Sequence, residues 1–142
     1  MTEQNFQNHS RLHPFYHYIL MPVSLGGIVY SGIQLVKSLS GDFQLPLLVF
    51  IAFLLLFGTI GLLRIYSLKV QDRVIRSEEN FRHYLLTGKQ LDRQLRSGQV
   101  VALRFASDAE FVALAARAIS ENLSPKAIKE SITQWRPDYR RV

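Results

Sequence analysis

The chain has 142 residues, enough for one domain or for one membrane segment with a small soluble part. Hydrophobic residues make up 48% of it and charged residues 20%, yet the formal net charge is +6, so apolar and basic residues are kept apart along the sequence. The absence of cysteine excludes disulfides, thiolate nucleophiles and sulfur-ligated zinc or iron–sulfur sites.

The amino-terminal segment, residues 1–14, is polar and begins a series of histidines. His9, His13 and His17 stand four residues apart, a spacing that would put them on one face of a helix, as in a metal or haem site. Pro14 argues against that helix because it disfavours helical geometry at His13 and has no N–H to donate. We therefore predict no metal site and no cofactor, a cytoplasmic lead-in, and a helix that begins near Pro14. A histidine-bound metal or haem is the alternative.

Two uncharged runs follow, residues 18–36 and 43–63. A helix needs about 20 apolar residues to cross a bilayer, so both runs predict spanning helices, over about 15–36 and 43–63. A cleaved signal peptide is the competing interpretation of the first run, and the polar lead-in argues against it. Residues 15–63 are thus expected to form a transmembrane hairpin. Pro22 is expected to kink the first span, whereas Pro46 lies in the first turn of the second, where a missing N–H costs little.

Basic residues flank the hairpin on one side. Arg11 precedes the first span and Arg64 follows the second, whereas the short connection holds only Lys37, and residues 64–142 carry the whole net charge of +6. Because lysine and arginine are retained in the cytoplasm, we predict a multi-pass protein of the bacterial inner membrane with both termini cytoplasmic. The lipid bilayer is then an expected partner. The predicted lipid contacts are His17, Arg64, Lys69, Arg140 and Arg141.

Small residues predict where the two spans meet, because helices in lipid associate by close backbone approach. The first span has Ser24, Gly27 and Ser31 on one stripe, and the second has Gly58 and Gly61. We expect these residues to pack the hairpin together, and a contact between copies of the chain is the alternative.

The second span continues as a juxtamembrane helix over residues 64–86, ending at Gly88. Val70, Val74, Phe81 and either Tyr84 or Leu85 form an apolar stripe on it, which we expect to receive the rest of the tail. Charged and aromatic residues alternate along the same helix and predict a specific interaction surface. That candidate surface consists of Arg73, Arg76, Glu78, Glu79, Asn80, Phe81, Arg82, His83 and Tyr84.

The tail, residues 87–142, reads as three short helices. Ser97 can cap a helix over about 98–106. Ser107 and Glu110 form a capping-box pattern that starts a helix ending near Asn122.

Ser124 followed by Pro125 predicts the start of the last helix. Ile128, Ile132 and Trp135 would lie on one side of it, and Pro137 would end it. The predicted fold class is an all-α membrane protein: a two-helix transmembrane hairpin, a long juxtamembrane helix and a small three-helix tail.

Several phrases of the sequence draw a resemblance: QDRVIRSEENFRHYLLTGKQLD (71–92), ALRFASDAEF (102–111), LSPKAIKESITQWRPDYRRV (123–142) and the opening QNHSRLHPFYHY. They resemble an uncharacterised family of small bacterial membrane proteins, a domain-of-unknown-function family. The resemblance implies a two-span inner-membrane protein, and it implies no activity or catalytic residue.

The sequence shows no G-x-S-x-G, H-E-x-x-H or phosphate-loop pattern, so we do not expect an enzyme. The patterned juxtamembrane helix instead predicts an accessory or scaffold protein that binds a larger membrane partner. The alternative is a self-associating membrane protein whose basic tail, which includes Lys126, Lys129 and Arg136, contacts anionic lipid or nucleic acid. Of these two ligands, nucleic acid is the less expected.

Overall fold

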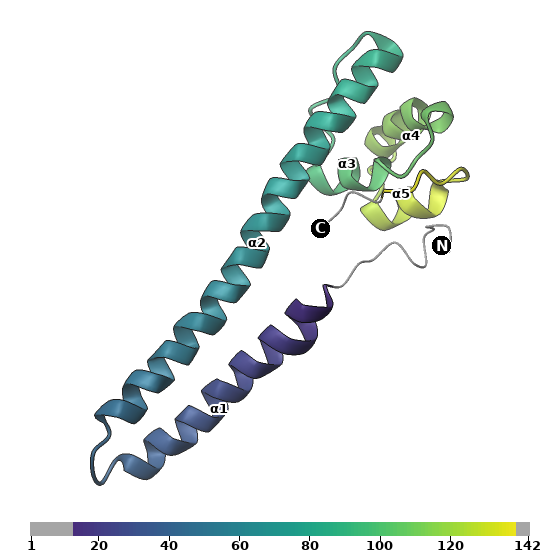
Figure 1. Ribbon diagram of the computed structural model, residues 1–142. Coiled ribbons are helices and arrows are strands. Elements are labelled where there is room, and N and C mark those ends of the chain that lie inside the picture. The colour runs from purple at the N-terminus through teal and green to yellow at the C-terminus, as the bar shows by residue number, and fades with distance from the viewer. Residues whose placement is uncertain (1–12, 139–142) are drawn as a thin grey trace. The chain divides into compact units, whose positions relative to one another are not determined.

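The computed structural model describes residues 13–138, and the regular elements of that part are all helical (Figure 1). The elements are a π-helical turn at Phe15–Leu20 and helices α1 Met21–Ser38, α2 Gln44–Thr87, α3 Ser97–Leu103, α4 Asp108–Ser120 and α5 Pro125–Ser131. The described chain divides into a hairpin unit, residues 13–67, and a tail unit, residues 68–138, and α2 contributes to both. The predicted all-helical fold is confirmed.

The first helical segment begins at Pro14, as the proline predicts. His13 lies before the helix, and its carbonyl accepts a hydrogen bond from the His17 N–H at 3.1 Å. The turn that follows is π-helical, and its last bond runs from the Met21 N–H to the Tyr16 carbonyl. Pro22, which has no N–H, comes directly after this wider turn.

Helix α2 begins after a short connection at residues 39–43. The Asp42 carboxylate accepts a hydrogen bond from the Gln44 N–H at 3.2 Å, which satisfies one of the free donors at the helix start. Pro46 lies in the first turn, as expected, where its lack of an N–H removes no helical hydrogen bond.

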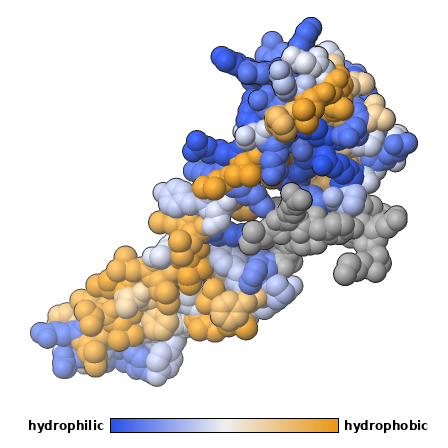
Figure 2. Space-filling view, turned by 45° about the horizontal axis from the view of Figure 1, so that its top comes forward, coloured by the Kyte–Doolittle hydropathy of each residue, from blue (hydrophilic) through white to orange (hydrophobic). Residues whose placement is uncertain are grey.

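Both helices of the hairpin unit are long and apolar enough to cross a membrane. The segment Phe15–Ser38 reaches a mean hydropathy of 1.7 and α2 one of 2.6, and only 11% and 0% of these apolar windows are buried within the chain. Figure 2 shows this apolar surface as the orange region over the hairpin.

The two helices of the hairpin unit meet through small residues on α1 and large ones on α2. Ser24 and Ser31 are 1% and 2% exposed, and their hydroxyls donate to the carbonyls of Leu20 and Gly27 at 2.7 and 2.6 Å. Their polar groups are thus satisfied within α1. Gly27 leaves room for the ring of Phe53, which a Cβ at Gly27 would strike.

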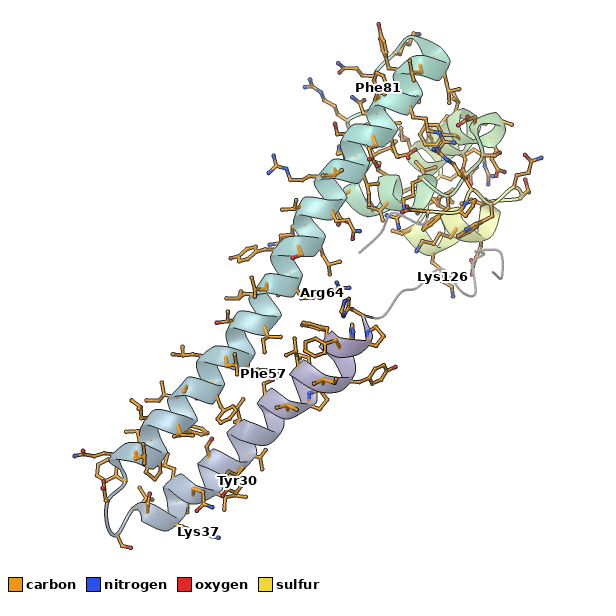
Figure 3. All side chains as sticks on the ribbon, in the orientation of Figure 1. Tyr30, Lys37, Phe57, Arg64, Phe81 and Lys126 are labelled. Carbon is orange, nitrogen blue, oxygen red and sulfur yellow. The ribbon has the colours of Figure 1, made fainter. Side chains whose placement is uncertain are left out.

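The prediction that Gly58 and Gly61 pack the hairpin is wrong. Among the described residues, a Cβ at either glycine would have no neighbour within 4 Å. Phe53, Phe57 and Ile60 form the inward side of α2 instead, with Ile60 9% exposed and Phe57 labelled between the helices in Figure 3. Only α1 therefore offers small residues for close packing of the two helices. Aromatic side chains of α2 fill the space between them.

Helix α2 runs without interruption to Thr87. Gly88 ends it with a φ of +70°, a conformation that glycine adopts without steric cost, and its N–H donates to the Tyr84 carbonyl at 2.8 Å. This is the end that the sequence predicts.

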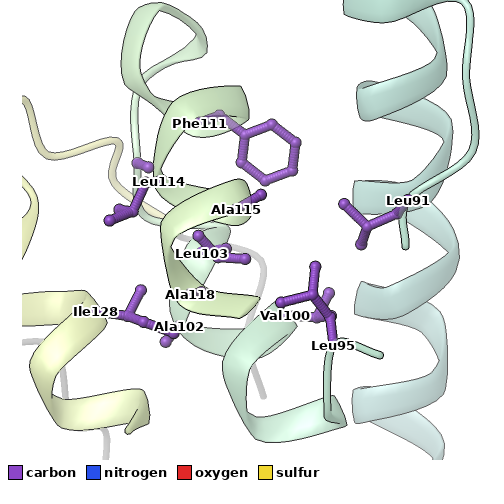
Figure 4. Close-up of a cluster of buried hydrophobic side chains, with 11 residues drawn as sticks. Leu91, Leu95, Val100, Ala102, Leu103, Phe111, Leu114, Ala115, Ala118 and Ile128 are labelled. Carbon is purple, nitrogen blue, oxygen red and sulfur yellow. The ribbon is translucent and has the colours of Figure 1, made fainter. Parts of the chain in front are cut away.

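The tail unit has its own hydrophobic core (Figure 4). It is built from Leu91, Leu95, Val100, Ala102, Leu103, Ala106, Phe111, Leu114, Ala115, Ala118 and Ile128. Helix α5 starts as predicted, with the Ser124 hydroxyl accepting from the Ala127 N–H at 3.1 Å. Helix α3 ends at Leu103, before the predicted end near residue 106.

Two local predictions for the tail are wrong in whole or in part. Ser107 precedes α4 as predicted, but its side chain makes no cap, so only the half of the capping box in which Glu110 accepts from the Ser107 backbone is present. Glu110 also accepts hydrogen bonds from the backbone N–H groups of Thr133 and Gln134 and from the Thr133 hydroxyl, at 2.8–3.1 Å.

The last helix accordingly ends at Ser131, well before Pro137. Ile132 is extended, and Trp135 pairs with Ala106 in an isolated antiparallel bridge rather than lying on a helix face. The Trp135 ring stacks on Phe105 with centroids 4.8 Å apart. The carboxyl-terminal segment thus crosses the α3–α4 connection as an extended strap.

Candidate interaction surface on helix α2

The predicted interaction surface lies on the part of α2 that belongs to the tail unit, and its residues divide between two faces. The inner face, against which the tail packs, includes Ile75 and Glu79, which are 6% exposed each. The outer face carries Val70, Val74, Ser77, Phe81 and Tyr84, and its four large residues are 60%, 51%, 62% and 52% exposed. The prediction that the apolar stripe receives the tail is therefore wrong.

Arg82 is the main link between the inner face and the tail. Its guanidinium donates to the Asp108 carboxylate at 2.6 Å, to Glu79 at 3.0 Å and to the Ala106 carbonyl at 2.8 Å. It also lies over the Phe111 ring, 4.4 Å from the centroid. The planar guanidinium, with five donors, suits a site that offers acceptors in several directions.

Two more predicted residues hold the loop between α2 and α3. The Arg76 guanidinium donates to the Leu95 carbonyl, and the Asn80 side-chain oxygen accepts from the Leu91 N–H, both at 2.8 Å. Leu91 and Leu95 are core residues, so these polar contacts fix the backbone from which two core side chains extend.

His83 also belongs to the inner face. Its Nδ1 lies 2.8 Å from the Lys89 carbonyl, and because a carbonyl only accepts, this nitrogen carries the hydrogen. The ring meets Phe111 edge to face at 6.1 Å. Arg76, Glu79, Asn80, Arg82 and His83 are thus structural parts of the tail unit, whereas Arg73, Glu78, Phe81 and Tyr84 remain exposed.

An open pocket of about 320 Å³ lies on this part of α2. Arg73, Arg76, Ser77 and Asn80 line it, so its described wall is basic and polar. Arg76 and Asn80 are already engaged by the following loop, which leaves Arg73 as its exposed charge.

The other predicted site residues lie elsewhere. Arg64 stands over the Tyr16 ring at 5.8 Å within the hairpin unit, and His17 is partly exposed next to Tyr16. Lys69 is exposed on α2. His9, Arg140 and Arg141 lie outside the described residues. Within residues 13–138, His, Asp and Glu form no group of three that could hold a metal ion.

Gln99 is a structural residue that the sequence analysis missed. It is 3% exposed. Its side-chain oxygen Oε1 accepts from the Arg96 N–H at 2.8 Å, and its side-chain nitrogen Nε2 donates to the carbonyls of Ala118 and Leu123 at 3.2 and 2.9 Å. One side chain therefore joins the start of α3 to the end of α4. Its position three residues after Arg96, typical of a residue that turns back to a helix start, was the available signal.

The charge on Glu110 also helps to hold the extended carboxyl-terminal strap in place. Partial burial raises the pKa of the Glu110 carboxyl, but the hydrogen bonds from Thr133, Gln134 and Ser107 stabilise the charged form and outweigh it. The pKa of Glu110 is therefore held below its ordinary value, and the carboxylate is ionised at neutral pH.

Comparison with known proteins identifies the chain at the level of its family. No curated protein and no solved structure matches it. A model of a family of unknown function, DUF6526, matches residues 1–142. With its whole length matched, the chain belongs to the DUF6526 family.

Proposed function

We propose that the protein is a non-catalytic accessory or scaffold protein of the bacterial inner membrane. In this proposal the hairpin unit crosses the bilayer twice and both termini are cytoplasmic. The tail unit binds a larger membrane protein on the cytoplasmic side.

The exposure of α2 carries the membrane part of the proposal. Its most apolar window, with a mean hydropathy of 2.6, is 0% buried within the chain. A core helix of a soluble protein would bury such residues, each worth about 1.5–3 kcal/mol on transfer from water. A bilayer supplies the missing apolar environment for every side of the helix.

Charged and aromatic residues support the orientation. Arg64 and Tyr16 meet just outside the uncharged runs 18–36 and 43–63, and such residues are common at a membrane interface. Lys37 lies in the last turn of α1, next to the connection, and is the only basic residue at the other end. The excess of basic residues therefore stays on the side of Arg64.

The way the tail folds supports a binding role. The tail unit is built around the inner face of α2, so its binding surfaces are formed on the same continuous helix that carries the apolar window. A small helical unit on such an anchor is suited to positioning a protein contact near the membrane.

Site-specific photocrosslinking in native membranes tests this function. A photoreactive residue is placed at exposed positions of the tail unit, Leu86, Ala116 and Lys126, and at Tyr30 in α1 as a control for lipid exposure. We expect the chain in the membrane fraction, and adducts with a second protein from the tail positions but not from Tyr30. Recovery in the soluble fraction, or adducts of the chain only with itself, would contradict the proposal.

A further inference from the structure

The outer face of α2 has the spacing of a coiled-coil seam. Its residues Val70, Val74, Ser77, Phe81 and Tyr84 alternate at intervals of four and three, which places Val74 and Phe81 at heptad position a and the others at d. We propose that a second copy of this chain covers the outer face, with the two α2 segments paired in parallel. This interface goes beyond the proposed function, because it assigns the oligomer and the surface that forms it.

The outer face can be covered without disturbing the tail. Successive helix residues are rotated by about 100°, so Phe81 lies about 200° around the helix from Glu79, and Ser77 the same angle from Ile75. Glu79 and Ile75 belong to the buried inner face, whereas Phe81 is 62% exposed. Each copy therefore keeps its own tail on one side and offers the opposite side for pairing.

The charges that flank the seam complement those of a second copy. Arg73 lies at position g and Glu78 at position e, and both side chains are exposed. In a parallel pair, position g of one helix faces position e of the other five residues further on. Arg73 of each copy would thus face Glu78 of the other, giving two opposite-charge pairs, whereas within one chain residues five apart do not meet.

The parallel arrangement also follows from the membrane insertion proposed above, on which this step rests. Two hairpins inserted in one bilayer have the same orientation, so their α2 segments leave the membrane side by side. A seam of two heptads is marginal for free helices in water, and confinement to one membrane raises the effective concentration of the second copy. Ser77 in the middle of the seam is small and allows close approach.

Cysteine crosslinking of the full chain in native membranes tests the pairing, because the protein has no cysteine of its own. Val74→Cys and Phe81→Cys place a thiol at position a. Leu86→Cys is the matched control, because Leu86 is 43% exposed but lies off the seam. On mild oxidation we expect disulfide-linked dimers from the first two variants and at least tenfold less from the control. Equal yields from all three, or no dimer from any, would overturn the proposal.

A charge exchange tests the orientation. Arg73→Glu in the Phe81→Cys background places two carboxylates opposite each other and should lower the dimer yield several-fold; adding Glu78→Arg should restore it. Failure of the double exchange to restore the yield would contradict the parallel register. If the Val74→Cys and Phe81→Cys variants formed adducts with a different protein and no dimers, this inference would be overturned while the proposed accessory function stood.

Discussion

Arg82 on α2 and Asp108 at the start of α4 are joined by a charge-assisted hydrogen bond of 2.6 Å. The same guanidinium holds the Ala106 carbonyl and stacks on Phe111, so one side chain fixes the connection between α3 and α4 against α2. Its side chain is only 11% exposed, which limits the competition from water at its buried partners, whereas the Asp108 side chain is 67% exposed. Arg82 thus joins the polar inner face of α2 to the start of α4, while Arg76 and Asn80 join the same face to the loop before α3.

Replacing Arg82 by alanine should destabilise the tail unit by about 2–4 kcal/mol, because Glu79 would be left buried without its partner. Arg82→Lys should destabilise the tail unit less than Arg82→Ala does, because a lysine keeps the charge but cannot reach three acceptors from one plane. Urea unfolding of the full chain in detergent, followed by the fluorescence of Trp135, the only tryptophan, measures this.

Arg93→Ala is the control for this prediction, because Arg93 is an exposed arginine of the loop before α3. Its loss should change the free energy of unfolding by less than about 0.5 kcal/mol. Equal stability of the Arg82 and Arg93 variants would show that the inner face does not depend on the guanidinium.

Where helices begin and end was largely predictable, because the signals are local. Pro14, Gly88 and the pair Ser124–Pro125 each act through their own backbone geometry, and the structure places helix ends at all of them. Local signals failed where a distant partner competed. The capping box at Ser107 is incomplete because the Ser107 side chain makes no cap, and the Glu110 carboxylate also binds Thr133, 23 residues away.

The face that binds the tail was not predictable from the apolar pattern. On α2 the apolar stripe is exposed and the polar face is buried, which is the reverse of the usual amphipathic arrangement. The arrangement is stable because Arg76 and Arg82 find backbone carbonyls 19 and 24 residues further along, and no local pattern encodes those distances. The division of the candidate surface into structural and exposed residues therefore needed the tertiary structure.

Glu110 should make the stability of the tail unit depend on acidic pH. Its pKa in the folded chain is below the ordinary value, so its contribution is fully present above the unfolded pKa and is lost as the pH falls through the folded pKa. Glu110→Gln should remove this part of the pH dependence and cost on the order of 1 kcal/mol at neutral pH. Urea unfolding monitored by Trp135 between neutral and acidic pH measures both effects.

Glu130→Gln is the matched control, because Glu130 is exposed and its ion pair with Lys126 is long at 3.8 Å. This variant should keep the pH profile of the native chain. If Glu110→Gln also kept that profile, the carboxylate would not be what holds the carboxyl-terminal strap.

Gln99→Ala should destabilise the tail unit by about 1–3 kcal/mol, because the Arg96 N–H and the Leu123 carbonyl would lose their partner and the Ala118 carbonyl would keep only the Leu123 N–H. Gln99→Glu should cost more, since a carboxylate would face two carbonyl oxygens without a hydrogen to donate. The same unfolding measurement applies, with the exposed Gln94→Ala as control. A Gln99→Glu variant as stable as the native chain would contradict the donor role of the amide.

Gly27 and Gly26 provide a matched test of the hairpin. A Cβ at Gly27 would strike the Phe53 ring, whereas one at Gly26 would meet no described atom within 4 Å. Gly27→Ala should therefore weaken the hairpin by about 1–3 kcal/mol. Gly26→Ala should be neutral or stabilise it by up to about 1 kcal/mol through helix propensity.

The measurement is energy transfer between dyes on cysteines introduced at the exposed Val23 and Leu62, as the purified protein is titrated with a denaturing detergent. We expect the helices of Gly27→Ala to separate at a lower detergent fraction than those of Gly26→Ala, and equal midpoints would refute the one-sided packing. Adding Phe53→Leu to Gly27→Ala should restore part of the loss, because a smaller side chain leaves space for the new methyl group. Restoration would locate the strain at that ring, since a general effect of alanine on α1 would not respond to a change on α2.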